Sequence, residues 1–217
     1  MVYRFIGFLL FIFSGSLTNA SEYPDAGVFE VVKDESELRV LIYPAGLLGS
    51  LGHSHVISTN DIDGRIELTN DPATSNVELV ISVESFEIDN EALRLEEGEA
   101  FEKPVPDKAK RGTRKNMLSE KLLDSGNFSN VIVRSNEWTG ALPDILVHGE
   151  FTIRDQTKVL AFLASVVTSD DQIVVTGNLT LTHAQLGLKP FTAALGSIRV
   201  RDEMEIKFRI TSTRLID

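Results

Sequence analysis

Hydrophobic and polar residues alternate along most of the chain. Residues 77–83 place Val, Leu, Ile and Val at every second position, and residues 173–182 continue in the same manner. The longest alternation covers residues 198–210 and reads as one strand, with Asp202 the single polar residue on its hydrophobic side. Such period-two patterning is typical of strands with one buried face and one solvated face. Several such strands in series predict an antiparallel sandwich or barrel.

Residues 89–116 interrupt this alternation. The stretch is highly charged, and most of its acidic residues precede most of its basic residues, with Pro104 and Pro106 between them. We interpret it as a charged surface excursion of a single domain, because strands resume after it. The spacing of Met117, Leu122 and Gly126 then predicts a short helix that ends at the glycine and caps one end of the barrel with its apolar side.

The first twenty residues differ from the rest of the chain. Arg4 is their only charge, residues 5–13 form an apolar run, and small residues lead up to Ala20. This order predicts a signal peptide over residues 1–20, cleaved after Ala20, and an exported, periplasmic domain over residues 21–217. A membrane anchor is the alternative, but the run is shorter than the roughly 20 residues that span a bilayer. We therefore expect no stable membrane insertion.

Composition narrows the chemistry. The chain has no cysteine, which excludes disulfides, thiol catalysis and thiolate metal sites. Its formal net charge of −11 disfavours nucleic acid and anionic membrane surfaces as partners. It contains no Gly-x-Ser-x-Gly elbow, no phosphate-binding loop and no His-Glu-x-x-His. We therefore do not expect an enzyme.

Two of the four histidines, His53 and His55, lie two residues apart and would share one side of a strand. The pair raises the hypothesis of a metal site. Zinc takes three or four ligands, so the pair alone is not enough. His148 or His183 could complete such a site only if folding brought them close to His53 and His55. In the simpler alternative, one imidazole bonds buried backbone and the other is exposed.

An apolar ligand is the other hypothesis that the strand pattern supports. A closed sheet of about eight strands is wide enough to hold one small ligand. Burying hydrocarbon contributes roughly 0.8 kcal/mol for each CH2 group, so a lipid tail needs no polar chemistry to bind. Patterning alone leaves two alternatives open, a filled core and a lined cavity.

The order of segments resembles the YceI-like family of polyisoprenoid-binding proteins over about residues 37–212. The similarity rests on the Ile-Asp-Asn step at residues 88–90 and on the helix and strand around residues 114–135. It also rests on the Gly-Glu-Phe-Thr-Ile-Arg-Asp-Gln-Thr-Lys hairpin at residues 149–158 and the closing segments at residues 186–188 and 200–206. Asp155 departs from the family pattern, which usually has glycine there. A Gly-His-x-His-Val stretch at residues 52–56 resembles the mark of a divergent branch.

This resemblance implies an all-β fold, an extended antiparallel β-barrel of about eight strands, lipocalin-like, with one or two short helices capping an end. It implies a hydrophobic small-molecule ligand, an isoprenoid quinone or polyprenyl lipid, and no covalent cofactor. A homodimer is left open. The expected tail-binding residues occupy inward strand positions: Leu79, Ile81, Val83, Val147, Phe151, Ile153, Ile206 and Phe208.

His53 and His55 follow the glycine-rich run of residues 45–52, which resembles a flexible rim at a barrel mouth. On this interpretation they lie where a polar headgroup would emerge, and one of them donates a hydrogen bond to a quinone-like oxygen. A metal-binding protein using the same pair remains the alternative.

Overall fold

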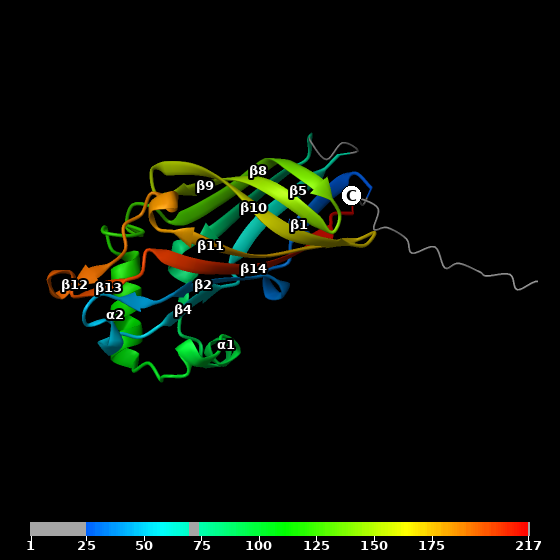
Figure 1. The fold of residues 1–217 in the computed structure, drawn as a ribbon. Coiled ribbons are helices and arrows are strands. Elements are labelled where there is room, and N and C mark those ends of the chain that lie inside the picture. Colours follow the sequence, from blue (N-terminus) through cyan, green and yellow to red (C-terminus); the bar gives the residue numbers. More distant parts are fainter. Residues whose placement is uncertain (1–24, 70–73, 217) are drawn as a thin grey trace, which may run out of the picture.

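The computed structural model describes residues 25–69 and 74–216, which fold into a β-barrel with two short helices at its side and end (Figure 1). The predicted signal peptide over residues 1–20 lies outside these residues. Within them, no helix is both long and apolar enough to cross a membrane.

Eight antiparallel strands close into a ring. Strand β1 pairs on one side with β5 and on the other with β14, so the sheet has no free edge there. The alternation left a sandwich or a barrel open, and the barrel of about eight strands implied by the resemblance is thereby confirmed. Around the ring the strands are β1 (Gly27–Val31), β5 (Ile62–Leu68), β6 (Asn76–Ser82), β8 (Asn130–Ala141), β9 (Asp144–Ile153), β10 (Gln156–Thr168), β11 (Gln172–Thr182) and β14 (Glu203–Arg214).

Two further groups of strands extend one end of the barrel. The C-terminal end of β14 pairs with β1, and its residues Glu205–Arg209 pair with β2 (Glu37–Ile42). Strand β2 pairs in turn with β4 (His55–Thr59), and β4 pairs with β7 (Glu87–Ile88). A small sheet combines β12 (Thr192–Ala193), β13 (Ile198–Val200) and β3 (Pro44–Ala45). Figure 1 places β12 and β13 at the end of the barrel opposite the C-terminus.

The prediction of one strand over residues 198–210 was wrong. The chain passes from β13 to β14 at Arg201 and Asp202, which leave the strand ladder. The Arg201 N–H donates to the Tyr43 carbonyl (2.8 Å), and the Asp202 carbonyl accepts from the His183 N–H (3.0 Å). Asp202 is consequently exposed rather than an inward residue of the barrel. Alternation continues through the break, so the sequence pattern does not reveal it.

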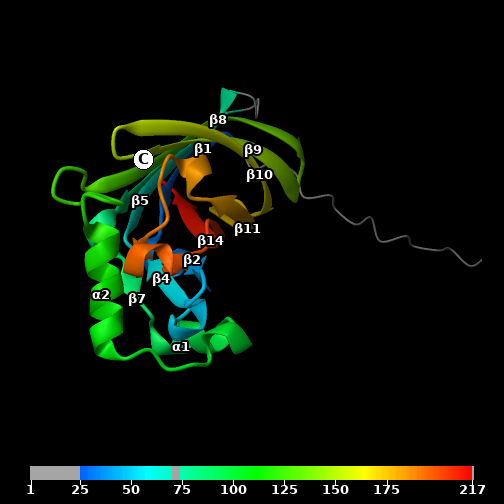
Figure 2. The same ribbon diagram turned by 60° about the vertical axis from the view of Figure 1, so that its left-hand side comes forward.

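The interpretation of residues 89–116 as a charged excursion missed its buried part. The segment forms α1 (Glu91–Glu96), a 3-10 turn over Glu99–Phe101, and α2 (Asp107–Leu118). Helix α1 contacts β4 and helix α2 contacts β7 (Figure 2). The Asn90 side chain caps α1 by accepting from two of its first N–H groups. Asp89, Arg94 and Phe101 are buried beneath the otherwise solvated surface.

The helix predicted to end at Gly126 is misplaced, because α2 ends at Leu118 and turns follow it. Met117, Leu122 and Leu123 nevertheless pack into the barrel core, as their apolar character required. The three residues cover the barrel end with apolar side chains. Leu122 and Leu123 do so from turns, so their burial does not require the helix that the sequence predicted.

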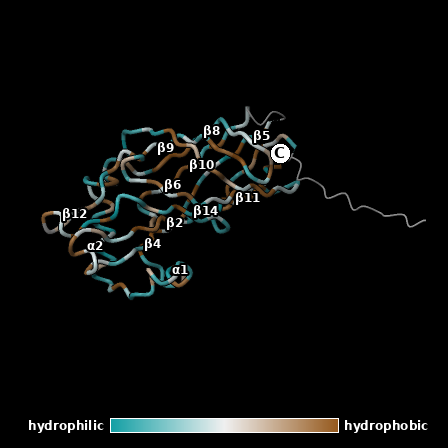
Figure 3. The backbone as a smooth tube through the Cα atoms, viewed as in Figure 1, coloured by the Kyte–Doolittle hydropathy of each residue, from teal (hydrophilic) through white to brown (hydrophobic). Residues whose placement is uncertain are grey.

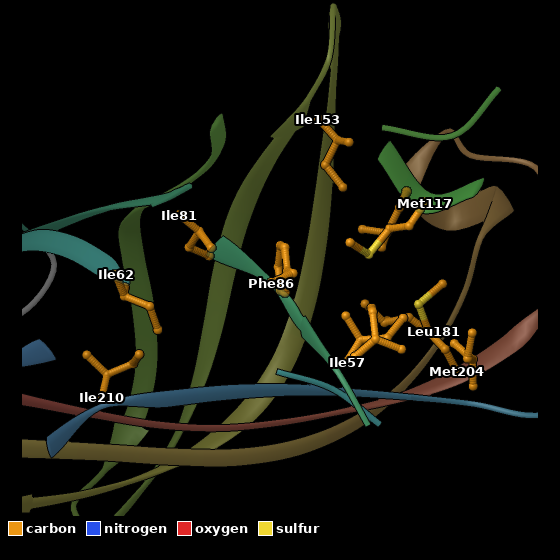
Figure 4. Packing of buried hydrophobic residues seen from close by; sticks show 12 residues of the cluster. Ile57, Ile62, Ile81, Phe86, Met117, Ile153, Leu181, Met204 and Ile210 are labelled. Atoms are coloured by element: carbon orange, nitrogen blue, oxygen red, sulfur yellow. The ribbon is translucent and has the colours of Figure 1, made fainter. Parts of the chain in front are cut away.

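Hydrophobic and hydrophilic residues alternate along the barrel strands (Figure 3). Most of the hydrophobic residues at inward positions are buried or partly buried in the core. Figure 4 shows inward side chains from different walls of the barrel, with Ile62 close to Ile210 and Met117 reaching in from α2. A separate cluster of Leu41, Val56 and Phe101 joins the barrel to the α1–α2 segment. The core thus extends from within the barrel to its helical side.

A β-bulge in β8 changes which residues face inward. The register with β9 shifts between Arg134 and Glu137, so two residues of β8 oppose Gly149 alone. A Cβ at Gly149 would lie only 3.0–3.1 Å from the rings of Phe151 and Phe162, so any larger residue at this position would crowd them. After the bulge, the inward phase of β8 changes from odd to even positions.

Candidate functional site

An internal cavity of about 450 Å3 occupies the barrel. Its size falls within the roughly 300–1,000 Å3 typical of small-molecule sites. Its wall consists almost entirely of apolar side chains from the barrel strands, supplemented by Met117, Leu122 and Leu123 at the helical end. The structure thus favours a lined cavity over a filled core, the two alternatives that the strand pattern left open.

Seven of the eight inward residues predicted to contact a lipid tail line this cavity: Leu79, Ile81, Val147, Phe151, Ile153, Ile206 and Phe208. Val83 does not. Strand β6 ends at Ser82, and Val83 begins a 3-10 turn in which its N–H donates to the Ser129 carbonyl (2.8 Å). The side chain is 1% exposed and packed elsewhere. The alternation therefore predicted its burial, but not the end of the strand.

Three aromatic rings meet edge to face inside the barrel. The centroid of Phe162 lies 5.9 Å from that of Phe151 and 6.0 Å from that of Phe208, and all three side chains line the cavity. Such pairs are held by ring quadrupoles as well as by burial. The sequence reading missed Phe162, because β10 also carries exposed apolar residues on its outer face, Val159, Leu163 and Val167, which conceal the alternation.

The cavity wall also includes Trp138, the only tryptophan of the chain. It lies after the β8 bulge, and the shifted phase turns it inward. Its indole nitrogen is buried and has no hydrogen-bond partner among the described residues. A buried N–H without an acceptor is costly, so this group is suited to donate to a polar atom of a bound molecule. No sequence signal marked Trp138, because bulge positions do not follow the alternation.

Polar side chains gather where β4, α2 and β13 approach the cavity. This end contributes His53, His55, Thr113, Asn116, His183 and Arg199 to the lining. The other end is lined by Leu142, Ile145, Ile173 and Trp138, which belong to one hydrophobic cluster. The cavity therefore has one polar end, which we call the mouth, and one mainly apolar end.

His55 is held on both sides by protein groups. Its Nδ1 lies 2.6 Å from Asp89 Oδ2, and its Nε2 lies 3.2 Å from the Thr113 hydroxyl. A carboxylate can only accept, so Nδ1 carries the proton and donates to Asp89. In the neutral ring Nε2 then accepts from Thr113. Both ring nitrogens are thereby occupied, and His55 positions the mouth rather than reaching a ligand.

Asp89 anchors this arrangement from beneath. It has no exposed surface, adopts φ of 59°, and accepts from Arg94 Nη1 (2.5 Å) and from the Val56 N–H (3.0 Å). Asp tolerates this left-handed conformation better than most residues. Burial opposes ionisation, but the hydrogen bonds from His55, Val56 and Arg94 outweigh it and hold the pKa of Asp89 below its usual value.

Arg94 completes the buried network. Its guanidinium donates to the carbonyls of Ser54 (2.7 Å), Phe101 (2.6 Å) and Lys103 (2.9 Å) as well as to Asp89. A buried charge is tolerated when it is paired and hydrogen-bonded, and Arg94 makes four such bonds from its two terminal nitrogens. The network therefore fixes the loop that carries His53 against helix α1. Sequence reading matched the Ile-Asp-Asn step to the family but assigned Asp89 no role.

His53 is the histidine of the pair that remains free. Its ring centroid lies 6.2 Å from that of His55, and it makes no hydrogen bond within the described part of the chain. Burial, together with the nearby charge of Lys103, lowers the pKa of His53. The ring is therefore neutral near pH 7 and offers one N–H donor and one acceptor at the cavity mouth.

The other two histidines do not join the pair. The His183 ring lines the cavity, but its Nδ1 lies 2.8 Å from the Asp202 carbonyl, and His148 lies partly buried on β9 and is absent from the cavity lining. Within residues 25–69 and 74–216, no three or more His, Asp or Glu side chains converge as metal ligands would. Metal ligation by His55 would also cost its bond to Asp89 or Thr113, so the geometry disfavours the metal hypothesis.

Comparison with known proteins gives the fold a family context. A family model described as "YceI-like domain" matches residues 19–212. Among solved structures, Burkholderia cenocepacia BcnA aligns with a TM-score of 0.59 at 15% identity, covering 83% of this chain and 98% of that one. A polyisoprenoid binding domain from Saccharophagus degradans, implicated in plant cell wall breakdown, aligns with a TM-score of 0.56 at 14% identity, covering 88% and 99%. No curated protein sequence matched.

Proposed function

The chain belongs to the YceI-like family, and on this premise we propose that it is an exported, periplasmic protein that binds an isoprenoid quinone or polyprenyl lipid within its barrel. It sequesters or carries the ligand and performs no catalytic step. The apolar cavity of about 450 Å3 is the observation that carries this proposal. The structural similarity to the polyisoprenoid binding domain from S. degradans supports the ligand class.

The cavity wall is suited to a hydrocarbon tail. Each CH2 group transferred from water into it contributes roughly 0.8 kcal/mol, so several isoprene units supply affinity without any polar contact. The edge-to-face rings of Phe151, Phe162 and Phe208 offer flat surfaces and ring edges to the methyl-branched, unsaturated units of such a tail. The specificity of the wall is therefore for shape and apolarity.

The mouth is suited to a headgroup that bears oxygen. His53 is neutral and has no protein partner within the described residues, so its N–H can donate to a quinone carbonyl. His55 is engaged by Asp89 and Thr113 and holds the adjacent wall in place. We thus assign the headgroup contact to His53 alone, a sharper statement than the sequence allowed for the pair.

Solvent extraction of the purified protein followed by mass spectrometry tests the proposal. We expect a co-purified isoprenoid lipid, or stoichiometric uptake of a long-chain quinone by emptied protein. Trp138 provides a direct reading, since the tail of a bound quinone extends toward the end of the cavity that holds the only tryptophan and will change its emission. A quinone lacking the tail is the control and should change the emission little. Protein that contains no lipid and takes up no quinone would refute the proposal.

A further inference from the structure

Four leucines stand exposed together at the mouth end of the barrel. The loop between β3 and β4 holds Leu47 (90% exposed), Leu48 (40%) and Leu51 (65%), and the turn between β12 and β13 holds Leu195, which is fully exposed. We call these four residues the leucine tip. Single exposed leucines are ordinary, but a group of them on one projection marks an interaction surface.

The leucine tip is a built feature. The Leu48 N–H donates to the Ser197 carbonyl (2.9 Å), and β3 pairs with β13, so the loop and the turn lie side by side. Leu195 itself adopts φ of 54°, a left-handed conformation that is uncommon for residues other than glycine, asparagine and aspartate. The backbone therefore holds an apolar side chain outward at a position where a small polar residue would suit the conformation better.

The leucine tip stands at the entrance of the cavity. Pro44 and Gly52 flank the loop and line the cavity, and Phe191 and Ile198 do the same on either side of the turn. Figure 1 places this small sheet at the end of the barrel, projecting beyond the closed ring of strands. Whatever surface the leucines enter would consequently lie directly in front of the mouth.

Charge around the leucine tip is opposite to that of the whole chain. Residues 44–52 contain no charged residue, and residues 184–201 contain Lys189, Arg199 and Arg201 but no Asp or Glu, in a chain of net charge −11. All three basic side chains are exposed. Carboxylates return only at Asp202. Basic side chains beside an apolar projection complement anionic lipid headgroups.

We propose that the leucine tip docks the mouth of the barrel onto an anionic lipid bilayer. The leucines enter the boundary between headgroups and acyl chains, and Lys189, Arg199 and Arg201 contact the headgroups. The ligand then passes between bilayer and cavity without crossing water. The transfer of ligand rests on the proposed function, whereas the docking of the leucine tip on the bilayer does not. The net charge of −11 disfavours anionic membranes for the chain as a whole, and the proposal depends instead on the locally basic surface around the leucine tip.

Sedimentation with lipid vesicles tests the docking. Wild-type protein should bind vesicles of phosphatidylcholine and phosphatidylglycerol, less so at high salt and less so without phosphatidylglycerol. The Leu47→Ser/Leu51→Ser/Leu195→Asn variant should lose roughly tenfold or more in binding for the three leucines removed. Asparagine at position 195 keeps a residue that accepts the left-handed conformation.

A matched control removes equally exposed leucines elsewhere. Leu95 on α1 is 81% exposed and Leu163 on the outer face of β10 is 69% exposed. The Leu95→Ser/Leu163→Ser variant should bind vesicles as the wild type does. Equal loss in both variants, or wild-type protein that ignores these vesicles, would overturn the proposal.

Two further measurements separate electrostatic attraction to the lipid from self-association of the protein. A Lys189→Gln/Arg201→Gln variant should lose only the part of the binding that depends on phosphatidylglycerol. Size-exclusion chromatography should show the same oligomeric state for the wild type and the variant without the leucine tip. A dimer that falls apart in that variant, together with no vesicle binding, would assign the surface to a second copy of the chain and overturn membrane docking.

Quinone uptake distinguishes failure of docking from failure of the proposed function. The variant without the leucine tip should take up detergent-dispersed quinone as well as the wild type, but should acquire it more slowly from vesicles. Wild-type protein that takes up quinone but binds no vesicles would refute docking alone. Wild-type protein that binds vesicles but takes up no quinone from detergent would refute the proposed function alone.

Discussion

The Nδ1 atom of His55 lies 2.6 Å from Oδ2 of Asp89, a carboxylate with no exposed surface. The contact joins the histidine pair to the charged segment that sequence patterning treated as solvated. It explains why two neighbouring histidines at one mouth have different roles. His55 is fixed by Asp89, and His53 is left for the ligand.

Removing the charge of Asp89 should be strongly destabilising. Asp89→Asn leaves the Arg94 guanidinium buried without its counter-charge, and breaking such a buried pair costs about 3–5 kcal/mol. Asparagine accepts the φ of 59° at this position, so the loss would come from charge and not from backbone strain. Urea denaturation at neutral pH measures the change in free energy of unfolding.

Asp124→Asn is the matched control for that measurement. Asp124 is also largely buried and also has positive φ (50°), but its nearest cation, Arg154, lies 4.0 Å away. We expect a loss of at most about 1.5 kcal/mol, the value of an ordinary hydrogen bond. Equal losses for the two variants would show that the buried pair has no special weight.

Acid should weaken the fold through Asp89. Its folded-state pKa lies below the unfolded value of about 3.9, so its stabilising effect is complete above roughly pH 5. The effect is lost as the pH falls below about 4 and through the lowered pKa. In Asp89→Asn this part of the acid dependence should disappear, and stability curves against pH would converge with those of the wild type at low pH. Parallel curves across that window would contradict the assignment.

Replacing His53 should alter headgroup selectivity without affecting the tail. His53→Ala removes the free donor at the mouth, so we expect a loss of about 1 kcal/mol for a quinone and almost none for a hydrocarbon tail of the same length. His55→Ala should instead lower stability, because Asp89 and Thr113 lose a partner. Titrations that follow Trp138 emission give the affinities, and unchanged selectivity in His53→Ala would rule out its contact with the headgroup.

Filling the cavity should block the tail. Val147 faces inward on β9 and its neighbour Leu146 does not line the cavity, so Val147→Trp and Leu146→Trp form a matched pair. We expect tail affinity to fall at least about tenfold in the first variant only, since several CH2 groups lose their place. The cavity leaves room for the new ring, and the cost in stability should stay within about 1–3 kcal/mol. Similar affinities in the two variants would refute the cavity as the binding site.

Trp138→Phe should stabilise the protein in the absence of ligand. The substitution removes a buried indole N–H that has no partner among the described residues and keeps most of the apolar ring. We expect a gain of up to about 1 kcal/mol in the free energy of unfolding of emptied protein, measured by circular dichroism. A loss of more than that would show that the N–H is satisfied in the folded state.

The strands and their buried faces were predictable because their physical cause is local. Inward and outward residues alternate in β6, β9 and β14, and a one-residue slip would turn the whole hydrophobic set to solvent. That constraint acts within each strand, and it accounts for the position of seven of the predicted residues on the cavity wall. It does not specify where a strand ends, so Val83 was placed on the cavity wall although it begins a turn.

Positions where two segments meet were not predictable. Trp138 faces inward only because the bulge opposite Gly149 shifts the alternation of β8. The break between β13 and β14 arises from hydrogen bonds to Tyr43 and His183, which are remote in sequence. Neither partner leaves a mark on the local pattern of apolar and polar residues.

By itself, the sequence determined the closed sheet, the apolar interior and the resemblance to a family, because these follow from alternation and segment order along the chain. The tertiary structure alone decided what the histidine pair does. Asp89 and Arg94 lie in a segment whose composition is that of a solvated surface, and they become a buried ion pair only when helix α1 packs on β4. That packing occupies His55 and leaves His53 free, because a hydrogen-bonding partner is a property of spatial neighbours.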